Sequence, residues 1–238
     1  MAPSKALITW GGWDGHEPQK VAHLFAGILE EAGIEVDIHD TLACFDDRDT
    51  LRDYDLIVPI WTMSPIEKHQ VENVSEAVAR GTGLAGCHGG MCDAFRERVL
   101  WQFMTGANWV AHPGGDGVSY RVEIADKEHE LNAGLSDFDV ATEQYYLHVD
   151  PANHVLATTR FPTVPWYHSP NGPVNVPVAW TRLWGLGRVY YNALGHHADV
   201  IASGTPFEML RRGLLWAAGS KQAAKASNHR FEEFQSPG

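Results

Sequence analysis

Gly83-Leu-Ala-Gly-Cys-His-Gly-Gly90 is the stretch of sequence that decides the fold. Small apolar residues form a short buried strand, and glycines then surround a central residue, which is the pattern of a nucleophile elbow: strand, tight turn, helix. The frame Gly-x-His-x-Gly places His88 at the centre of the turn. Cys87 takes that place only if Ala85 stands in for the first glycine, and a buried cysteine is more often a small core residue. We therefore favour His88.

The chain before this turn alternates short apolar segments with amphipathic ones. A helix is expected from Pro18 to Gly33, because its apolar residues recur at three- and four-residue steps, and the same pattern returns over 71–78. Pro59 puts the end of one strand in doubt. Strands are expected at 5–10, 34–38, 55–60 and 83–87. This order predicts a parallel sheet with helices on both faces.

The chain after the turn changes character. Helices are expected at 94–104 and 206–218, and between them lie strand-like segments near 119–124, 138–146, 154–160 and 176–191. We interpret the proline-rich stretch 161–177 as a long loop over the site or at an interface. From Gly219 onward the sequence is polar. We therefore expect one domain over residues 1–220 and a polar C-terminal tail, 221–238, that frays or packs on a neighbour.

Composition limits the partners and the compartment. The 238 residues include 30 acidic and 18 basic side chains, for a net charge of −12. Such a chain repels phosphate backbones, so we expect neither nucleic acid nor a membrane as partner. No apolar run approaches 18 residues, the start lacks a signal-peptide layout, and three cysteines form no disulfide framework. We expect a cytoplasmic protein, and the proline-rich stretch and tail predict a homo-oligomer.

Candidate site residues follow the strands, because ligands of an open parallel sheet bind beyond the carboxyl ends of its strands. The loops expected there start at Gly11, Trp61, His88 and Leu194. The first carries Trp13, Asp14 and His16, and its alternative interpretation is an ordinary turn that caps a helix. The last carries His196 and His197, with Asp199 able to orient one imidazole.

The segment 142–148 contains Glu143, Tyr145 and His148. On a regular strand Glu143 and Tyr145 share one face while His148 lies on the other, so Glu143 and His148 converge only if the segment is irregular. His112 precedes a strand and is either a site residue or a turn histidine.

These residue types predict three kinds of role. His88, His196 and Glu143 are the candidate catalytic groups, because imidazoles and carboxylates move protons near neutral pH. His88, His112 and His196 are a candidate set for a divalent metal such as Zn²⁺, with His16 as the alternative to His112. No glycine-rich phosphate loop with a lysine occurs, so we expect no nucleotide cofactor. The candidate substrate-binding residues are Trp13, Asp14, His16, Trp61, Tyr145 and His148.

Several motifs together resemble a known family. They include Gly11-Gly-Trp-Asp-Gly-His16, the turn that ends in Cys87-His88, Glu143-Gln-Tyr145, and Trp184-Gly-Leu-Gly-Arg-Val-Tyr-Tyr-Asn-Ala-Leu-Gly-His196. In this order they resemble the ThuA-like, or trehalose-utilisation, family over nearly the whole chain. The resemblance implies a flavodoxin-like, doubly wound, mainly parallel α/β sheet of the class I glutamine amidotransferase type, with His88 in place of the amidotransferase cysteine. It also implies catabolism of trehalose or related disaccharides, including 3-keto sugars.

Three functional hypotheses follow. The leading one is an enzyme that cleaves or isomerises an oxidised glycoside with His88, His196 and Glu143, with or without a divalent metal. The second is a hydrolase or amidotransferase-like enzyme that uses Cys87 as nucleophile. The third is a non-catalytic protein that binds a small-molecule sugar, with tryptophans as stacking platforms.

Overall fold

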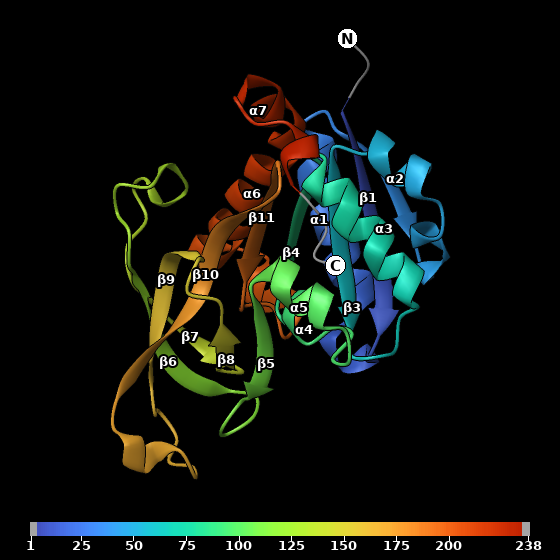
Figure 1. The fold of residues 1–238 in the computed structure, drawn as a ribbon. Coiled ribbons are helices and arrows are strands. Elements are labelled where there is room, and N and C mark those ends of the chain that lie inside the picture. Colours follow the sequence, from blue (N-terminus) through green and yellow to red (C-terminus); the bar gives the residue numbers. More distant parts are fainter. Residues whose placement is uncertain (1–3, 235–238) are drawn as a thin grey trace.

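A nine-stranded sheet forms the centre of the computed structural model, which describes residues 4–234 (Figure 1). Its first half is parallel and contains nearly continuous apolar strands, as expected where helices cover both faces. In spatial order these strands are β2 (Glu35–His39), β1 (Lys5–Gly12), β3 (Leu56–Thr62), β4 (Gly83–Cys87) and β11 (Gly187–Asn192).

Strand β3 continues through Pro59 to Thr62, so the doubt about its end was misplaced. It pairs with β4 only at Leu56 and Ile57. Asp55 turns its carbonyl toward β4, where it accepts the N–H of Gly83 at 2.8 Å. Backbone groups of alternate residues face the same neighbouring strand, so position 59, like position 55, faces β4. The pairing with β4 has already ended at Ile57, so the missing N–H of Pro59 removes no ladder hydrogen bond.

The second half of the sheet is antiparallel, so the sheet as a whole is mixed. The strands of this half are β10 (Val174–Trp184), β9 (His154–Phe161), β6 (Val118–Ile124) and β7 (Phe138–Thr142). A two-residue turn joins β10 to β11, and a turn of that length connects antiparallel neighbours rather than parallel ones. A separate small sheet pairs β5 (Ala107–Ala111) with β8 (Tyr146–Val149).

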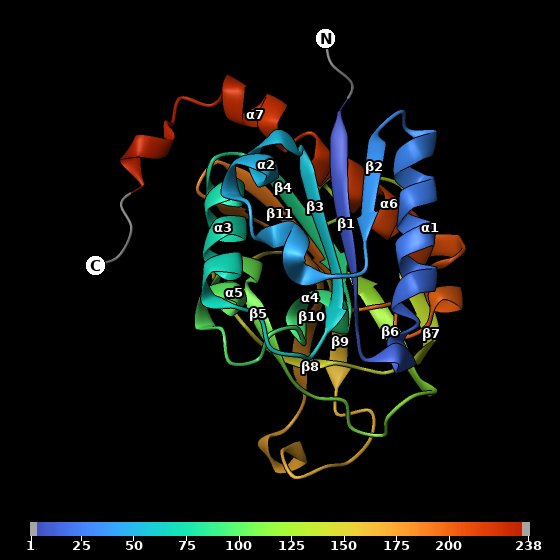
Figure 2. The same cartoon turned by 90° about the vertical axis from the view of Figure 1, so that its right-hand side faces the viewer.

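Helices pack on both faces of the parallel half, as the sequence predicted (Figure 2). Helices α1 (Pro18–Glu31) and α6 (Gly204–Ala218) contact each other on one face. The other face carries α2 (Arg48–Asp53), α3 (Lys68–Ala79) and α5 (Val99–Thr105). The helix expected over 94–104 is thus shorter, and the single-turn α4 (Gly89–Cys92) directly follows the elbow.

Two further segments differ from expectation. The loop expected at 161–177 spans only 162–173, because β9 reaches Phe161 and β10 begins at Val174; both views show it projecting beyond the sheet (Figures 1 and 2). The tail packs on its own domain through α7 (Ser220–Ala226), whose Lys221 donates to the Arg52 carbonyl at 2.6 Å. Residues 235–238 of the predicted tail lie outside the described residues. Among residues 4–234, no helix is both long enough and apolar enough to cross a membrane.

Candidate functional site

His88 occupies the centre of the elbow, with φ 49° and ψ −139°. Its N–H donates to the Asn192 carbonyl at 2.7 Å, and the Tyr191 hydroxyl donates to its carbonyl at 3.0 Å. Position 90 has room only for glycine, because a Cβ there would lie 2.9 Å from Ile60 Cα. This unusual backbone aims a fully buried imidazole across the carboxyl edge of the sheet, and strain of this kind gathers at functional sites.

Three imidazoles and one carboxylate converge at this edge: His16, His88, His196 and Glu143. All four are buried, and one donor atom from each lies within 4.8 Å of the others. Glu143 Oε2 lies 3.2 Å from His88 Nε2, 3.2 Å from His196 Nδ1 and 3.9 Å from His16 Nε2. The residues come from the β1–α1 loop, the elbow, the loop after β11 and the segment between β7 and β8.

The outward-facing nitrogens show where the protons lie. His88 Nδ1 is 2.9 Å from the Ala193 carbonyl, which only accepts, so this nitrogen carries the hydrogen. In the neutral ring, Nε2 then presents a lone pair to the cluster. His16 Nδ1 lies 2.7 Å from the Thr62 hydroxyl, which can hold the same tautomer. For His196 the buried Nδ1 faces inward, 3.2 Å from Glu143 Oε2, and within the described part of the chain it makes no contact with hydrogen-bond geometry.

The four groups carry unequal charge. Burial, together with the neighbouring imidazoles, lowers the pKa of His16 to about 2. Burial also lowers the pKa of His88, and Glu143 offsets this only in part. For His196, burial is outweighed by the Glu143 carboxylate, and its pKa is raised. Burial acts to raise the pKa of Glu143, but the imidazoles of His196 and His88 outweigh it and hold that pKa below its usual range.

Glu143 reaches the cluster because the chain between β7 and β8 is irregular. Its backbone carbonyl accepts the Tyr120 hydroxyl at 3.1 Å, and the Gln144 amide donates to Thr159 Oγ1 at 2.8 Å, so this break is held from both sides. The Tyr145 ring stacks on His88 with centroids 4.0 Å apart. His148 lies beyond the break on β8, exposed and opposite Asn108, and the structure does not bring it to the cluster.

Other predicted residues lie around the cluster. The Trp13 ring is 46% exposed and meets His16 edge-on, with centroids 4.7 Å apart. Trp61 lies against Gly11, where a Cβ would come within 2.6 Å of the indole. Asp14 is exposed, and its backbone carbonyl accepts the N–H of Glu17.

His112 takes an outer position. Its Nε2 lies 3.6 Å from the other carboxylate oxygen of Glu143, and the side chain is 37% exposed. The structure thus groups His16, rather than His112, with His88 and His196. Sequence reasoning also missed Asp116, whose Oδ2 lies 3.5 Å from His197 Nε2 and 4.0 Å from His196 Nε2. The signal for it was the run Gly114-Gly-Asp-Gly117, since glycines on both sides let a loop bring an acid close.

The cluster fits a divalent metal ion. Imidazole nitrogens and a carboxylate oxygen are ligands of Zn²⁺ and similar ions, and two ligands of a tetrahedral site with bonds of about 2.0 Å lie roughly 3.3 Å apart. The 3.2 Å separations of His88 and His196 from Glu143 match this. Metal-binding histidines donate their other N–H to an acceptor, as His88 does. His16, His88, His196 and Glu143 are therefore the residues that would hold such an ion.

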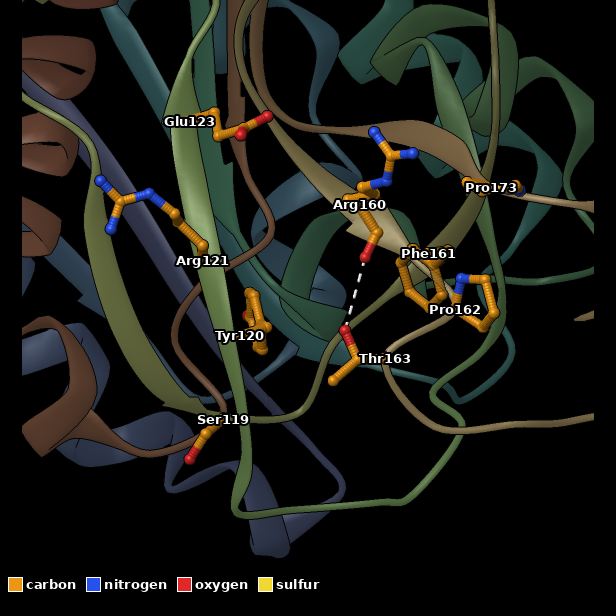
Figure 3. Close-up of a pocket in the computed structure, with 9 residues that line it drawn as sticks. All are labelled: Ser119, Tyr120, Arg121, Glu123, Arg160, Phe161, Pro162, Thr163 and Pro173. Atoms are coloured by element: carbon orange, nitrogen blue, oxygen red, sulfur yellow. Dashed lines mark hydrogen bonds between the residues drawn. The ribbon is translucent and has the colours of Figure 1, made fainter.

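A separate open hollow of about 390 Å³ lies where β6 and β9 diverge (Figure 3). Ladder pairing between these strands ends at Val122 and Thr159. On the β9 side of this hollow, the Thr163 hydroxyl donates to the Arg160 carbonyl at 3.4 Å. Tyr120 lines this hollow and its hydroxyl holds the Glu143 backbone, but the four converging side chains are not part of its lining.

A buried group of three imidazoles and a carboxylate, at the carboxyl edge of the parallel half of a mixed sheet, defines an α/β protein with a candidate acid–base or metal centre. A model of the ThuA family, described as trehalose utilisation, matches residues 5–217, and the chain belongs to this family.

Solved structures show the same fold. A ThuA-like protein from Bacteroides uniformis is 19% identical, with a TM-score of 0.72 over 91% of this chain and 92% of its own. One from Parabacteroides merdae is 20% identical, with a TM-score of 0.70 over 92% and 91%. A β-galactosidase from Bacillus circulans is 13% identical with a TM-score of 0.60, over 92% of this chain and 31% of its own. A comparison with curated proteins gave no match.

Proposed function

We propose that this protein is an enzyme of carbohydrate catabolism that acts on a disaccharide or related sugar, with a 3-keto sugar as its substrate class. The observation that carries the proposal is the convergence of His16, His88, His196 and Glu143 in one buried cluster. Membership of the trehalose-utilisation family supports a sugar as substrate. We also propose that the fold is of the class I glutamine amidotransferase type, because His88 stands at the centre of an elbow.

The chain's own residues divide the proton chemistry. His88 is held neutral with Nε2 facing inward, which suits a base, while His196 beside the Glu143 carboxylate retains a proton, which suits an acid. Groups whose surroundings separate their pKa values are the usual acid and base of a site. A 3-keto group acidifies the adjacent C–H, so proton removal by His88 starts an elimination or isomerisation. The alternative is a divalent ion held by His16, His88, His196 and Glu143; such an ion would polarise the keto oxygen as a Lewis acid, in place of proton transfer by His88 and His196.

The half-exposed Trp13 ring gives the site a surface on which a sugar ring can stack. It lies beside His16, next to the buried cluster. The same feature would serve a protein that only binds its sugar, and turnover distinguishes the two functions.

The Cys87 alternative has less support. Burial raises the pKa of the Cys87 thiol to about 12, so little thiolate exists at neutral pH. His88, not Cys87, occupies the centre of the elbow. A thiol reagent applied to the native protein should therefore leave activity unchanged. Loss of activity in step with modification of Cys87 would restore this alternative.

Elemental analysis of purified protein tests the metal part of the proposal. We expect about one divalent ion per chain in wild type and a large loss in His88→Ala. His148→Ala is the matched control, because it removes an exposed imidazole outside the cluster. Turnover of 3-keto disaccharides is then measured with each variant. A metal-free wild type that still turns over substrate would exclude the metal, and a protein that binds sugar without turnover would exclude the enzyme.

We also propose that the protein is cytoplasmic and forms a homo-oligomer. The exposed Trp166 and Tyr167 in the 162–173 loop support an interface there. A monodisperse monomer in solution scattering would contradict the homo-oligomer.

A further inference from the structure

Asp116 lies at the rim of the cluster on the loop between β5 and β6. The residues beside it, Gly114, Gly115 and Gly117, all have positive φ, so the loop follows a path that glycine permits. The side chain of Asp116 is 49% exposed, and its Oδ2 lies 4.0 Å from His196 Nε2. This carboxylate therefore faces the outer nitrogen of an imidazole whose inner nitrogen belongs to the buried cluster.

The three imidazoles of the cluster have the same requirement. To bind a metal ion, each must present an unprotonated nitrogen inward, so in the neutral ring its hydrogen must lie on the outer nitrogen. The Ala193 carbonyl meets this requirement for His88, and Thr62 Oγ1 can do so for His16. For His196 the inner atom is Nδ1, 3.2 Å from Glu143 Oε2, and the group opposite its outer atom is Asp116.

We propose that Asp116 is a positioning residue, whose carboxylate accepts the Nε2 hydrogen of His196 and so keeps Nδ1 available to the cluster. The inference rests on the proposed function, because it assigns Asp116 to the same centre. The separation is 4.0 Å, and a shift of about 1 Å in a loop with three glycines would bring the two atoms within hydrogen-bond distance. His197 Nε2, at 3.5 Å from the same oxygen, is a second donor to this carboxylate.

The first test is the affinity for Zn²⁺, measured by competition with a chromophoric chelator. Loss of an outer partner of a metal-binding histidine weakens binding about 10- to 100-fold. We expect this loss in Asp116→Asn and Asp116→Ala, with partial recovery in Asp116→Glu. The control is Asp139→Asn, which removes the same charge from a 77% exposed carboxylate on β7. Equal affinity in wild type, Asp116→Asn and Asp116→Ala would overturn the proposal.

Nitrogen-15 NMR of the histidine rings of Zn²⁺-loaded protein gives a second readout that does not depend on activity. In wild type we expect His196 to carry its hydrogen on Nε2 in slow exchange with water, and Asp116→Asn to speed that exchange. The stoichiometry tests the rival role of Asp116: two ions per chain in wild type, falling to one in Asp116→Asn, would make it a ligand together with His197 and would overturn the proposal.

A wild type that binds no metal would refute the metal part of the proposed function without deciding the role of Asp116. The NMR measurement is then made on metal-free protein above the pKa of His196. An Nε2-protonated ring in wild type that becomes a mixture of tautomers in Asp116→Asn would support the positioning role. Identical tautomers in the two proteins would overturn it.

Discussion

Thr62→Val tests how the cluster is held with the least change in shape. Thr62 is buried at the end of β3, and its hydroxyl lies 2.7 Å from His16 Nδ1. Valine is nearly isosteric but leaves that nitrogen buried without a partner, which costs about 1–3 kcal/mol of folding free energy. The same change frees the His16 tautomer, so metal affinity should fall about 10- to 100-fold.

Two measurements check this prediction. Urea unfolding gives the loss of folding free energy, and chelator competition gives the change in metal affinity. Thr158→Val is the matched control, since it makes the same substitution at a half-buried strand position on β9. If Thr62→Val unfolds at the same urea concentration as wild type and binds metal equally well, the hydroxyl does not hold His16 and the reasoning fails.

Three further predictions concern folding. Gly12→Ala should lose about 1–2 kcal/mol from its backbone at φ +80°, and more because the new Cβ collides with the Thr62 carbonyl; thermal unfolding will show it, and an unchanged Tm would contradict it. The pKa of His16 is lowered from 6.5 to about 2, so below pH 6.5 the unfolded chain takes up a proton that the folded chain refuses. As the pH decreases below 6.5, the folding free energy should therefore decrease by up to about 1.4 kcal/mol per pH unit because of this group. Urea unfolding between pH 7 and 5 should show a smaller decrease in His16→Gln than in wild type, and equal decreases in the two proteins would refute the prediction. Trp101→Phe removes the indole donor to the Met91 carbonyl at 2.8 Å, and a loss of about 1–3 kcal/mol in denaturant unfolding is expected, whereas a wild-type midpoint would show that the bond contributes nothing.

Local sequence patterns predicted the parallel half of the fold well. Apolar runs mark β1, β3 and β4, and the three- and four-residue spacing after Pro18 marks α1. Such patterns work because periodicity records which face of one element is buried. They did not reveal the antiparallel half as part of the same sheet, since the order of strands in space depends on pairings between distant segments.

Position 88 is the part of the site that the sequence by itself determined. Glycines around His88 are required by a cramped turn, and that requirement is local, so the strand–turn–helix motif could be read directly. The expectation that loops after β1 and β11 reach the same edge also followed from the parallel order, and the structure brings His16 and His196 there.

Only the tertiary structure decided which side chains meet. Glu143 joins the cluster because the chain breaks between β7 and β8, and His16 rather than His112 is grouped with His88 because the β1–α1 loop turns inward. Asp116 comes close through a glycine-rich loop whose path no periodicity encodes. The physical reason is the same in each case: distances of 3–4 Å between side chains depend on the relative placement of segments far apart in sequence, which local pattern does not record.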